Sequence, residues 1–323
     1  GPALICPAEA VVAATDRQEG SVLARIAIAA LASVSMISSA LAWDGARAYH
    51  LRPGGASDIS LALNVIHAED TRLGLGDTTL DVWALTPTYR TTFDVMGNVG
   101  FVLIGLPVGG MTFDSLAGTI DTGIAQGDLV LGAGLGLAGM PALAPMDYAM
   151  HKPGFQAMVE GKLFLPTGDY DANRMVNLGQ NRWSFQASLP ISYALGDNMI
   201  DPELTTFEIR PVLQVFGDNE DPFVGTGANV MSQAPIFGVE GHITRNFGNS
   251  VWAAIDGYYE TGGETSFDGV GQGDGLETLA LGATLGLVLS QNVATRLSYR
   301  HLVYSNDPDL AGHTLELTAA YLF

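Results

Sequence analysis

The sequence has little positive charge and only one cysteine. It holds 14 lysines and arginines against 34 aspartates and glutamates, so the formal net charge is −20. A protein with this balance has too few cations to neutralise phosphates, which excludes nucleic acid as a partner. The one cysteine, Cys6, precedes the expected start of the mature chain. Disulfides, thiolate metal sites and a cysteine nucleophile are therefore not expected in the mature protein.

Long apolar runs are also scarce, although 47% of the residues are hydrophobic and the mean hydropathy is +0.24. One stretch, 26–37, resembles a membrane helix; it follows Arg25 and leads into Ser-Ser-Ala-Leu-Ala, which ends at Ala42. These features are typical of a secretory signal peptide. The alternative is a membrane anchor helix, but serines interrupt the apolar run, which is also short for a helix that spans a membrane. We expect 1–42 to be an upstream extension and signal peptide, cleaved after Ala42. An irregular lead-in, 43–55, follows.

The end of the chain alternates with a period of two, as a half-apolar strand does. The two faces are Leu315, Leu317, Ala319, Tyr321 and Phe323 on one side and Thr314, Glu316 and Thr318 on the other. A strand that stops on an aromatic residue resembles the closing strand of bacterial outer-membrane β-barrels. We therefore expect the apolar face to meet lipid and the polar face to meet a lumen.

Ten earlier stretches alternate in a similar way, and an eleventh, 99–108, is apolar on both faces, so its phase is unclear. The 40 glycines are far more than average usage predicts. The expected strands are 57–67, 79–93, 99–108, 128–138, 154–165, 182–195, 204–216, 234–245, 250–260, 277–289, 292–304 and 313–323. Most are close to the length that a tilted membrane strand needs. The fold class is therefore all-β: an up-and-down transmembrane antiparallel barrel of about 12 strands over residues 56–323.

The connections alternate between long and short, which is typical of a barrel with long extracellular loops and short periplasmic turns. Residues 109–127 are expected to form one of the long loops, and 139–153 is an exception among the short turns. Both chain ends then lie in the periplasm, so the lead-in 43–55 is expected in the periplasm or inside the lumen. A plug in the lumen is one hypothesis for it.

Charged residues on the polar faces are candidates to line the pore. They are Glu160, Lys162, Glu208, Arg210, Glu240, His242, Asp256, Glu260, Arg296, Arg300 and Glu316. Inside a barrel such groups form a paired ladder or line water. We favour structural pairing, with unpaired members setting selectivity. Glu316 is expected to pair with Arg296 or Arg300, because these arginines lie on the preceding strand.

The loop over 167–181 is a candidate constriction of the pore. Its polar candidates are Asp169, Asp171, Arg174, Asn177, Asn181 and Arg182. Its start mimics a calcium-binding loop, but Arg174 stands where glycine is needed, so calcium is not expected. We expect Arg174 and Arg182 to pair with Asp169 and Asp171, and the asparagines to bond the backbone.

Strand 128–138 presents mainly Gly132, Gly134 and Gly136 to the lumen. Such small residues leave room for a plug, a loop or a solute. A hydrophobic solute is hypothesised to leave through the wall beside them.

Several motifs resemble an outer-membrane family named for the meta-pathway of phenol degradation. They are 168–185, Gly127-Asp-Leu-Val-Leu-Gly132, Asp201-Pro-Glu-Leu-Thr-Thr-Phe-Glu208, Glu240-Gly-His-Ile-Thr-Arg245 and Gly262-Gly-Glu-Thr265. The resemblance covers roughly residues 45–323. It implies an outer-membrane barrel that passes aromatic or other hydrophobic compounds, and it carries over no catalytic residue.

The predicted function is passive uptake of a small hydrophobic or aromatic compound across the outer membrane. The expected partners are outer-membrane lipid and lipopolysaccharide, the solute, and the barrel-assembly machinery through the strand that ends at Phe323. No cofactor or resident metal is expected. The alternative is a structural or adhesive barrel without transport. A barrel enzyme is less favoured, because His242 and Ser298 face inward without a recognisable triad.

Overall fold

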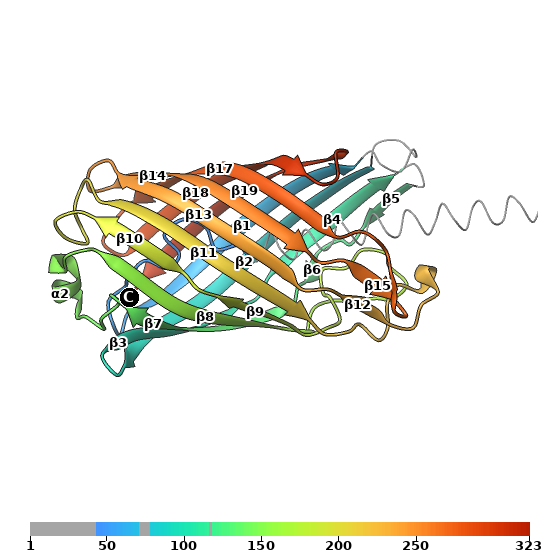
Figure 1. Cartoon of the computed structure of the whole chain (residues 1–323), viewed down its shortest axis with the longest axis horizontal. Coiled ribbons are helices and arrows are strands. Elements are labelled where there is room, and N and C mark those ends of the chain that lie inside the picture. Colours follow the sequence, from blue (N-terminus) through green and yellow to red (C-terminus); the bar gives the residue numbers. More distant parts are fainter. Residues whose placement is uncertain (1–42, 71–77, 116–117) are drawn as a thin grey trace, which may run out of the picture.

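The computed structural model describes residues 43–70, 78–115 and 118–323. The expected signal peptide and its cleavage after Ala42 lie outside the described residues. The chain forms a closed antiparallel barrel in which strands that follow one another also lie side by side (Figure 1).

Twelve staves make up the barrel wall, as predicted. They are β1 (Ser57–Asp70), β2 (Thr78–Val95), β3 (Asn98–Gly105), β7 (Leu129–Ala138), β8 (Phe155–Leu165), β9 (Ser184–Ser188) with β10 (Ile191–Leu195), β11 (Thr205–Phe216), β13 (Ile236–Asn246), β14 (Val251–Gly262), β17 (Leu276–Val288), β18 (Val293–Ser305) and β19 (Leu310–Leu322). Pro190 interrupts the stave made of β9 and β10, because proline has no N–H for the ladder. The wall closes where β1 pairs with β19.

The third stave is longer than expected, and the predicted loop over 109–127 is wrong. Beyond Pro107 the chain continues along β2 as β4 (Val108–Ser115), with Val108 opposite Leu85. It then returns as β5 (Gly118–Asp121) and β6 (Ala125–Gln126), both paired with β4. Gly109 and Gly110 suggest a turn, but here they sit against the backbone and ring of Trp83.

The two ends of the barrel differ. Short turns at 96–97, 247–250 and 289–292 lie at the periplasmic end, together with α2 (Pro145–Met150) between β7 and β8. The opposite end carries the longer connections, with η1 (Val224–Thr226) and a small sheet of β12 (Met231–Gln233), β15 (Thr265–Phe267) and β16 (Val270–Gly271) (Figure 1). In the part of the chain that the model describes, no helix is both long and apolar enough to cross a membrane.

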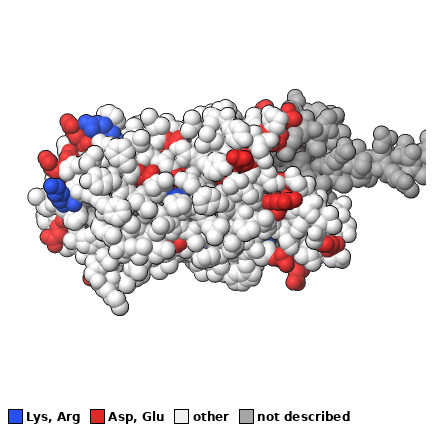
Figure 2. All heavy atoms as spheres, viewed as in Figure 1, with Lys and Arg blue, Asp and Glu red and all other residues white. Residues whose placement is uncertain are grey.

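An apolar belt surrounds the wall. Large hydrophobic side chains point outward on each of its staves, and neighbours such as Leu63 and Leu317 lie opposite one another across the closing pair. Tyr321 and Phe323 stack with ring centroids 6.0 Å apart at the periplasmic rim. Charged side chains gather mainly toward the two ends of the visible face (Figure 2). A closed barrel with this belt is a membrane-spanning protein, and it places the chain in the outer membrane.

The glycines of β7 do not leave an empty space. Phe101 and Leu103, which project inward from β3, fill the lumen beside Gly134 and Gly132. A Cβ atom on Gly134 would lie 2.3 Å from the Phe101 ring. The room expected here for a plug, a loop or a solute is therefore already occupied, and the solute exit beside it stays a prediction. Neighbouring aromatic and aliphatic side chains take up the room that the glycines leave.

Gly139 ends β7 in a conformation that an alanine should not tolerate. Gly139 and Gly123 both have a φ of 64°, but a Cβ on Gly139 would lie 1.8 Å from the Phe155 carbonyl oxygen, whereas Gly123 has open space. We expect Gly139→Ala to lower the free energy of unfolding by about 2 kcal/mol more than Gly123→Ala, because both incur left-handed strain but only one adds a backbone clash. Urea unfolding in lipid vesicles measures the difference. Equal losses would contradict it.

Candidate functional site in the barrel lumen

The lead-in 43–55, called the lumen segment from here on, runs inside the barrel and bridges it. The Asp44 carboxylate accepts a hydrogen bond from Lys162 of β8 at 2.5 Å and lies 2.8 Å from the Arg210 guanidinium of β11. From the opposite side of the barrel, Arg296 of β18 donates to the Ala46 carbonyl at 3.0 Å. Because β18 and β8 stand across the barrel from one another, the segment divides the lumen.

Hydrogen bonds hold the middle of the lumen segment. The Arg47 guanidinium donates to Thr244 at 2.8 Å and to Asn246 at 2.7 Å, and its carbon lies 4.5 Å from the centre of the Trp252 ring. The Tyr49 hydroxyl lies 2.6 Å from a carboxylate oxygen of Glu160. These contacts tie the segment to β8, β13 and β14.

An apolar cluster holds the segment at the periplasmic end. The Leu51 side chain is fully buried and packs with Val99 and Phe101 of β3 and Met158 of β8. Met140 and Met199 from the periplasmic connections complete the cluster. The segment is therefore anchored by charge along its length and by hydrophobic contact at its base.

The charges of the lumen segment are matched to those of the wall. Burial alone would raise the pKa of Asp44, but the charges of Lys162 and Arg210 outweigh it and hold that pKa below its usual value of 3.8. The resulting stabilisation is present above the unfolded pKa and is lost only as the pH falls through the lower, folded pKa. Burial lowers the pKa of His50 to about 4, so that its ring is neutral at pH 7. The docked segment is therefore suited to neutral conditions.

A network of ion pairs centred on Arg210 closes one half of the lumen. Its guanidinium lies 3.1 Å from Glu240 and 3.2 Å from Glu160, and it donates to Gln186 at 2.8 Å. His242 continues the network, 3.8 Å from Glu240 and 2.6 Å from Asp256. Residues this deeply buried keep their charges only when they are paired. Paired side chains therefore fill this half of the lumen.

The other half of the lumen contains a cavity of about 360 Å³, called the inner cavity. It lies between the lumen segment and the inward faces of β1, β2, β18 and β19, and β3, β7 and β8 also contribute to its wall. At its periplasmic end, Asp58 accepts hydrogen bonds from Arg52 at 2.5 Å and Arg90 at 3.1 Å. Arg296 donates to Glu316 at 2.7 Å, which is the pairing predicted from the sequence.

A smaller cavity of about 100 Å³, the outer cavity, lies nearer the extracellular loops. Ile66, Leu302 and Leu310 contribute its apolar wall. Trp43 lines both cavities, and its ring meets Tyr258 edge-on with centroids 5.6 Å apart. Gly238 leaves the room for this ring, since a Cβ there would lie 2.6 Å from it. Trp43 is therefore the side chain between the two cavities.

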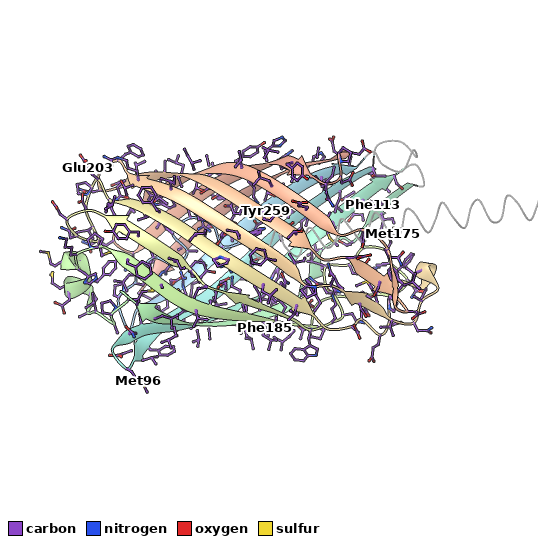
Figure 3. All side chains as sticks on the ribbon, in the orientation of Figure 1. Met96, Phe113, Met175, Phe185, Glu203 and Tyr259 are labelled. Atoms are coloured by element: carbon purple, nitrogen blue, oxygen red, sulfur yellow. The ribbon has the colours of Figure 1, made fainter. Side chains whose placement is uncertain are left out.

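The loop over 167–181 turns into the extracellular half of the lumen. Val176 is fully buried against Met111 and Phe113 of β4, and Met175 and Leu178 pack beside it. Figure 3 shows Met175 and Phe113 close together near the loop end of the barrel. Asp128 ties the base of the loop by accepting from the amides of Gly168 and Gln180. Hydrophobic contact thus holds the inward part of this loop.

The polar candidates of that loop have local roles. Arg174 lies 3.6 Å from Asp171, as expected, but Arg182 stacks on Phe216 and donates to Gln233, so its expected pairing with Asp169 or Asp171 is wrong. Asp169 accepts from the Gln126 amide. Asn177 bonds the backbone at Asp171 and Arg174, and Asn181 donates to Asn219.

The remaining lumen candidates lie along the inward face. Glu208 accepts from the Arg47 amide at 2.9 Å. Glu260 and Arg300 line the outer cavity, where Arg300 lies 5.0 Å from the Tyr258 ring. Together with the network around Arg210 and the Arg296–Glu316 pair, these residues extend from the outer cavity to the inner one.

Sequence reasoning missed three groups of residues. Asp58 and Arg90 lie on the polar faces of the first two strands, where the alternation already placed them inward. The charges of the lumen segment were passed over because the segment has no periodicity. The apolar tip of the loop, Met175 and Val176, carries no alternating signal. Within the described ranges, no cluster of three or more histidines, cysteines or acids is arranged to hold a metal ion.

The chain resembles known proteins in sequence and fold. A family model described as "Putative MetA-pathway of phenol degradation" matches residues 53–311. A crystal structure of an outer membrane channel from Pseudomonas putida F1 is 19% identical, with a TM-score of 0.70 over 87% of this chain and 100% of that one. The translocator domain of the autotransporter NalP from Neisseria meningitidis is 10% identical, with a TM-score of 0.48 over 97% of each chain. Comparison with curated proteins returns no match.

Removing Arg210 should destabilise the barrel strongly. Arg210→Met leaves Glu160 and Glu240 buried without their shared cation, so we expect the free energy of unfolding to fall by about 3–5 kcal/mol. Arg245→Met is the matched control, because Arg245 is half exposed and pairs with Glu203 at the rim; its loss should stay within about 1 kcal/mol. Urea unfolding in vesicles measures both. A similar, small effect at both positions would rule out a structural role for the network.

Proposed function

Since the family model matches most of its length, the chain belongs to the family of the putative MetA-pathway of phenol degradation, and we propose that it is an outer-membrane channel for passive uptake of small hydrophobic or aromatic compounds. The observation that carries the proposal is the order of the spaces along the lumen: an outer cavity with a partly apolar wall, then Trp43, then the inner cavity.

The extracellular half of the lumen is suited to an apolar solute. Inward-facing Ile66, Leu80, Val82 and Phe113 pack with the tip of loop 167–181 into a buried apolar cluster. A dry apolar cavity of about 150 Å³ is known to accept benzene in another protein. The outer cavity, whose wall includes Ile66, Leu302 and Leu310, is of the same order of size. The loop restricts entry to small molecules.

The periplasmic half restricts flow. The lumen segment and the network around Arg210 fill much of the cross-section, which argues against a wide aqueous pore such as those of larger barrels. Passage then requires that Trp43 and the lumen segment move aside. The Pseudomonas putida protein is described as an outer membrane channel, and the shared fold is compatible with the same class of function here.

Two further roles follow from the wall. We infer that the aromatic end of β19, Tyr321 and Phe323, is recognised by the barrel-assembly machinery. We also infer that acidic side chains of the extracellular connections, such as Asp114, Asp218 and Asp221, meet lipopolysaccharide through divalent cations. We infer no catalysis, because His242 faces Asp256 and Glu240 rather than a hydroxyl nucleophile.

Uptake into liposomes tests the function. We expect vesicles that contain the refolded protein to take up a neutral aromatic such as phenol faster than empty vesicles, and to exclude a disaccharide. Trp43→Ala should increase aromatic uptake several-fold, because the ring between the two cavities is removed. Trp83→Ala, whose ring faces lipid, is the control. If neither conductance nor aromatic uptake exceeds that of empty vesicles, the protein is a structural barrel.

Asp44→Asn should loosen the lumen segment. The substitution removes the charge that pairs with Lys162 and Arg210, and a charged hydrogen bond of this kind contributes about 1.5–3 kcal/mol. Single-channel recording is expected to show more frequent or larger openings than in the unaltered protein. Asp81→Asn, an exposed carboxylate near the rim, serves as the control. An unchanged conductance would show that the segment does not limit flow.

A further inference from the structure

The inner cavity has an excess of positive charge in a strongly acidic protein. Eight charged side chains line it, five cationic and three anionic: Arg47, Arg52, Arg90, Lys162 and Arg296, with Asp44, Asp58 and Glu316. Five of the 14 lysines and arginines therefore face one cavity, although the chain as a whole has a net charge of −20. The visible outer surface shows the opposite balance, with acidic groups predominant (Figure 2).

The excess amounts to two charges. One belongs to Arg47, whose guanidinium is held by Thr244 and Asn246, and the other lies at the periplasmic end of the cavity. Lys162 is paired with Asp44, and Arg296 is paired with Glu316. Asp58, by contrast, is shared: the same carboxylate oxygen, Oδ2, accepts from Arg52 and from Arg90. Arg90 also donates to the Ala48 carbonyl at 3.3 Å, but one buried carboxylate serves both guanidinium groups, which leaves about one positive charge without an acidic partner among the described residues of the cavity.

The two arginines crowd one another. Burial, and next the charge of Arg90, lower the pKa of Arg52 to about 9. Repulsion of this kind is relieved when an anion binds between the two groups. Guanidinium groups are also the side chains best suited to bind a planar carboxylate through two parallel hydrogen bonds.

The wall leading to these arginines changes gradually from apolar to charged. Facing residues of β1 and β2 run from Ile66 and Val82 near the loops, through Ser60 and Thr88, to Asp58 and Arg90 at the periplasmic end. The gradient matches a solute with an apolar body and an anionic head. The head would lie near Arg52 and Arg90 while the body extends past Trp43.

We propose that the inner cavity is a binding site for the anionic head group, a carboxylate or phenolate, of an aromatic or amphipathic solute. The proposal deepens the function proposed above, since it names the chemical class that such a channel would select. Arg52 and Arg90 bind the head, Asp58 limits their attraction, and the hydroxyls of Ser60 and Thr88 lie next along the path.

Two probes of the same shape test the site. Benzoate carries the charge and benzamide does not, and binding of each to the full barrel in lipid nanodiscs is measured by calorimetry. We expect benzoate to bind at least tenfold more tightly than benzamide. Arg90→Gln should weaken benzoate binding by about tenfold, because one charged hydrogen bond is lost, and should leave benzamide unchanged.

Asp58→Asn separates this site from a merely structural role. Removing the shared carboxylate leaves both guanidinium groups for the ligand, so benzoate should bind more tightly, opposite in sign to Arg90→Gln. Arg90→Lys keeps the charge and should retain part of the affinity, and it serves as the second variant if Arg90→Gln does not fold. Arg245→Gln, on an exposed arginine, should leave both probes unaffected.

The outcomes distinguish the site from the channel. Equal binding of benzoate and benzamide, or benzoate affinity that does not respond to either Arg90→Gln or Asp58→Asn, overturns the anion site even if phenol uptake in liposomes persists. Charge-dependent binding of benzoate without phenol uptake supports the anion site and contradicts the proposed channel function.

Discussion

Pairing of β1 with β19 is the constraint on which the rest of the molecule depends. It satisfies the backbone groups of what would otherwise be two open edges, which hydrocarbon cannot do. Ser57 and Phe323 complete it with two reciprocal backbone hydrogen bonds of 2.9 Å at the periplasmic rim. That closure also decides where the lumen segment enters, because the chain turns into the barrel immediately before Ser57. Ser57 therefore connects the closing strand pair of the wall to the segment that occupies the lumen.

Once the wall is closed, the polar faces of its strands must be satisfied inside. Arg210, Glu160 and Glu240 do this by pairing, and the lumen segment adds Asp44 to the same group. Where pairing is complete, the lumen is solid; where it is not, near Arg52 and Arg90, a cavity remains. The distribution of charge thus divides the lumen into a half filled by paired side chains and a half that contains the inner cavity.

The number of strands and their inward and outward faces could be predicted from the sequence, because lipid on one side and a polar lumen on the other impose a period of two. The predicted pair of Arg296 and Glu316 followed from the same alternation. The predicted loop at 109–127 failed because Pro107 and the glycines after it suggest a turn, whereas the pairing with β2 continues beyond them. The inward course of loop 167–181 and of residues 43–55 was among the hypotheses drawn from the sequence. The contacts of Val176 and Asp44 could not be predicted, since irregular segments have no periodicity and their contacts are set by tertiary structure.

Because the lumen segment is continuous with β1, a displaced segment remains tethered at Ser57. A short tether of this kind holds a group at an effective concentration in the millimolar range. A solute that opens the path must therefore compete with an internal occupant that never diffuses away. Dilute polar molecules with weak affinity would lose this competition, while a compound that partitions strongly into the apolar outer half would win it. In the proposed channel, the tether would therefore return the lumen segment to its site after each passage.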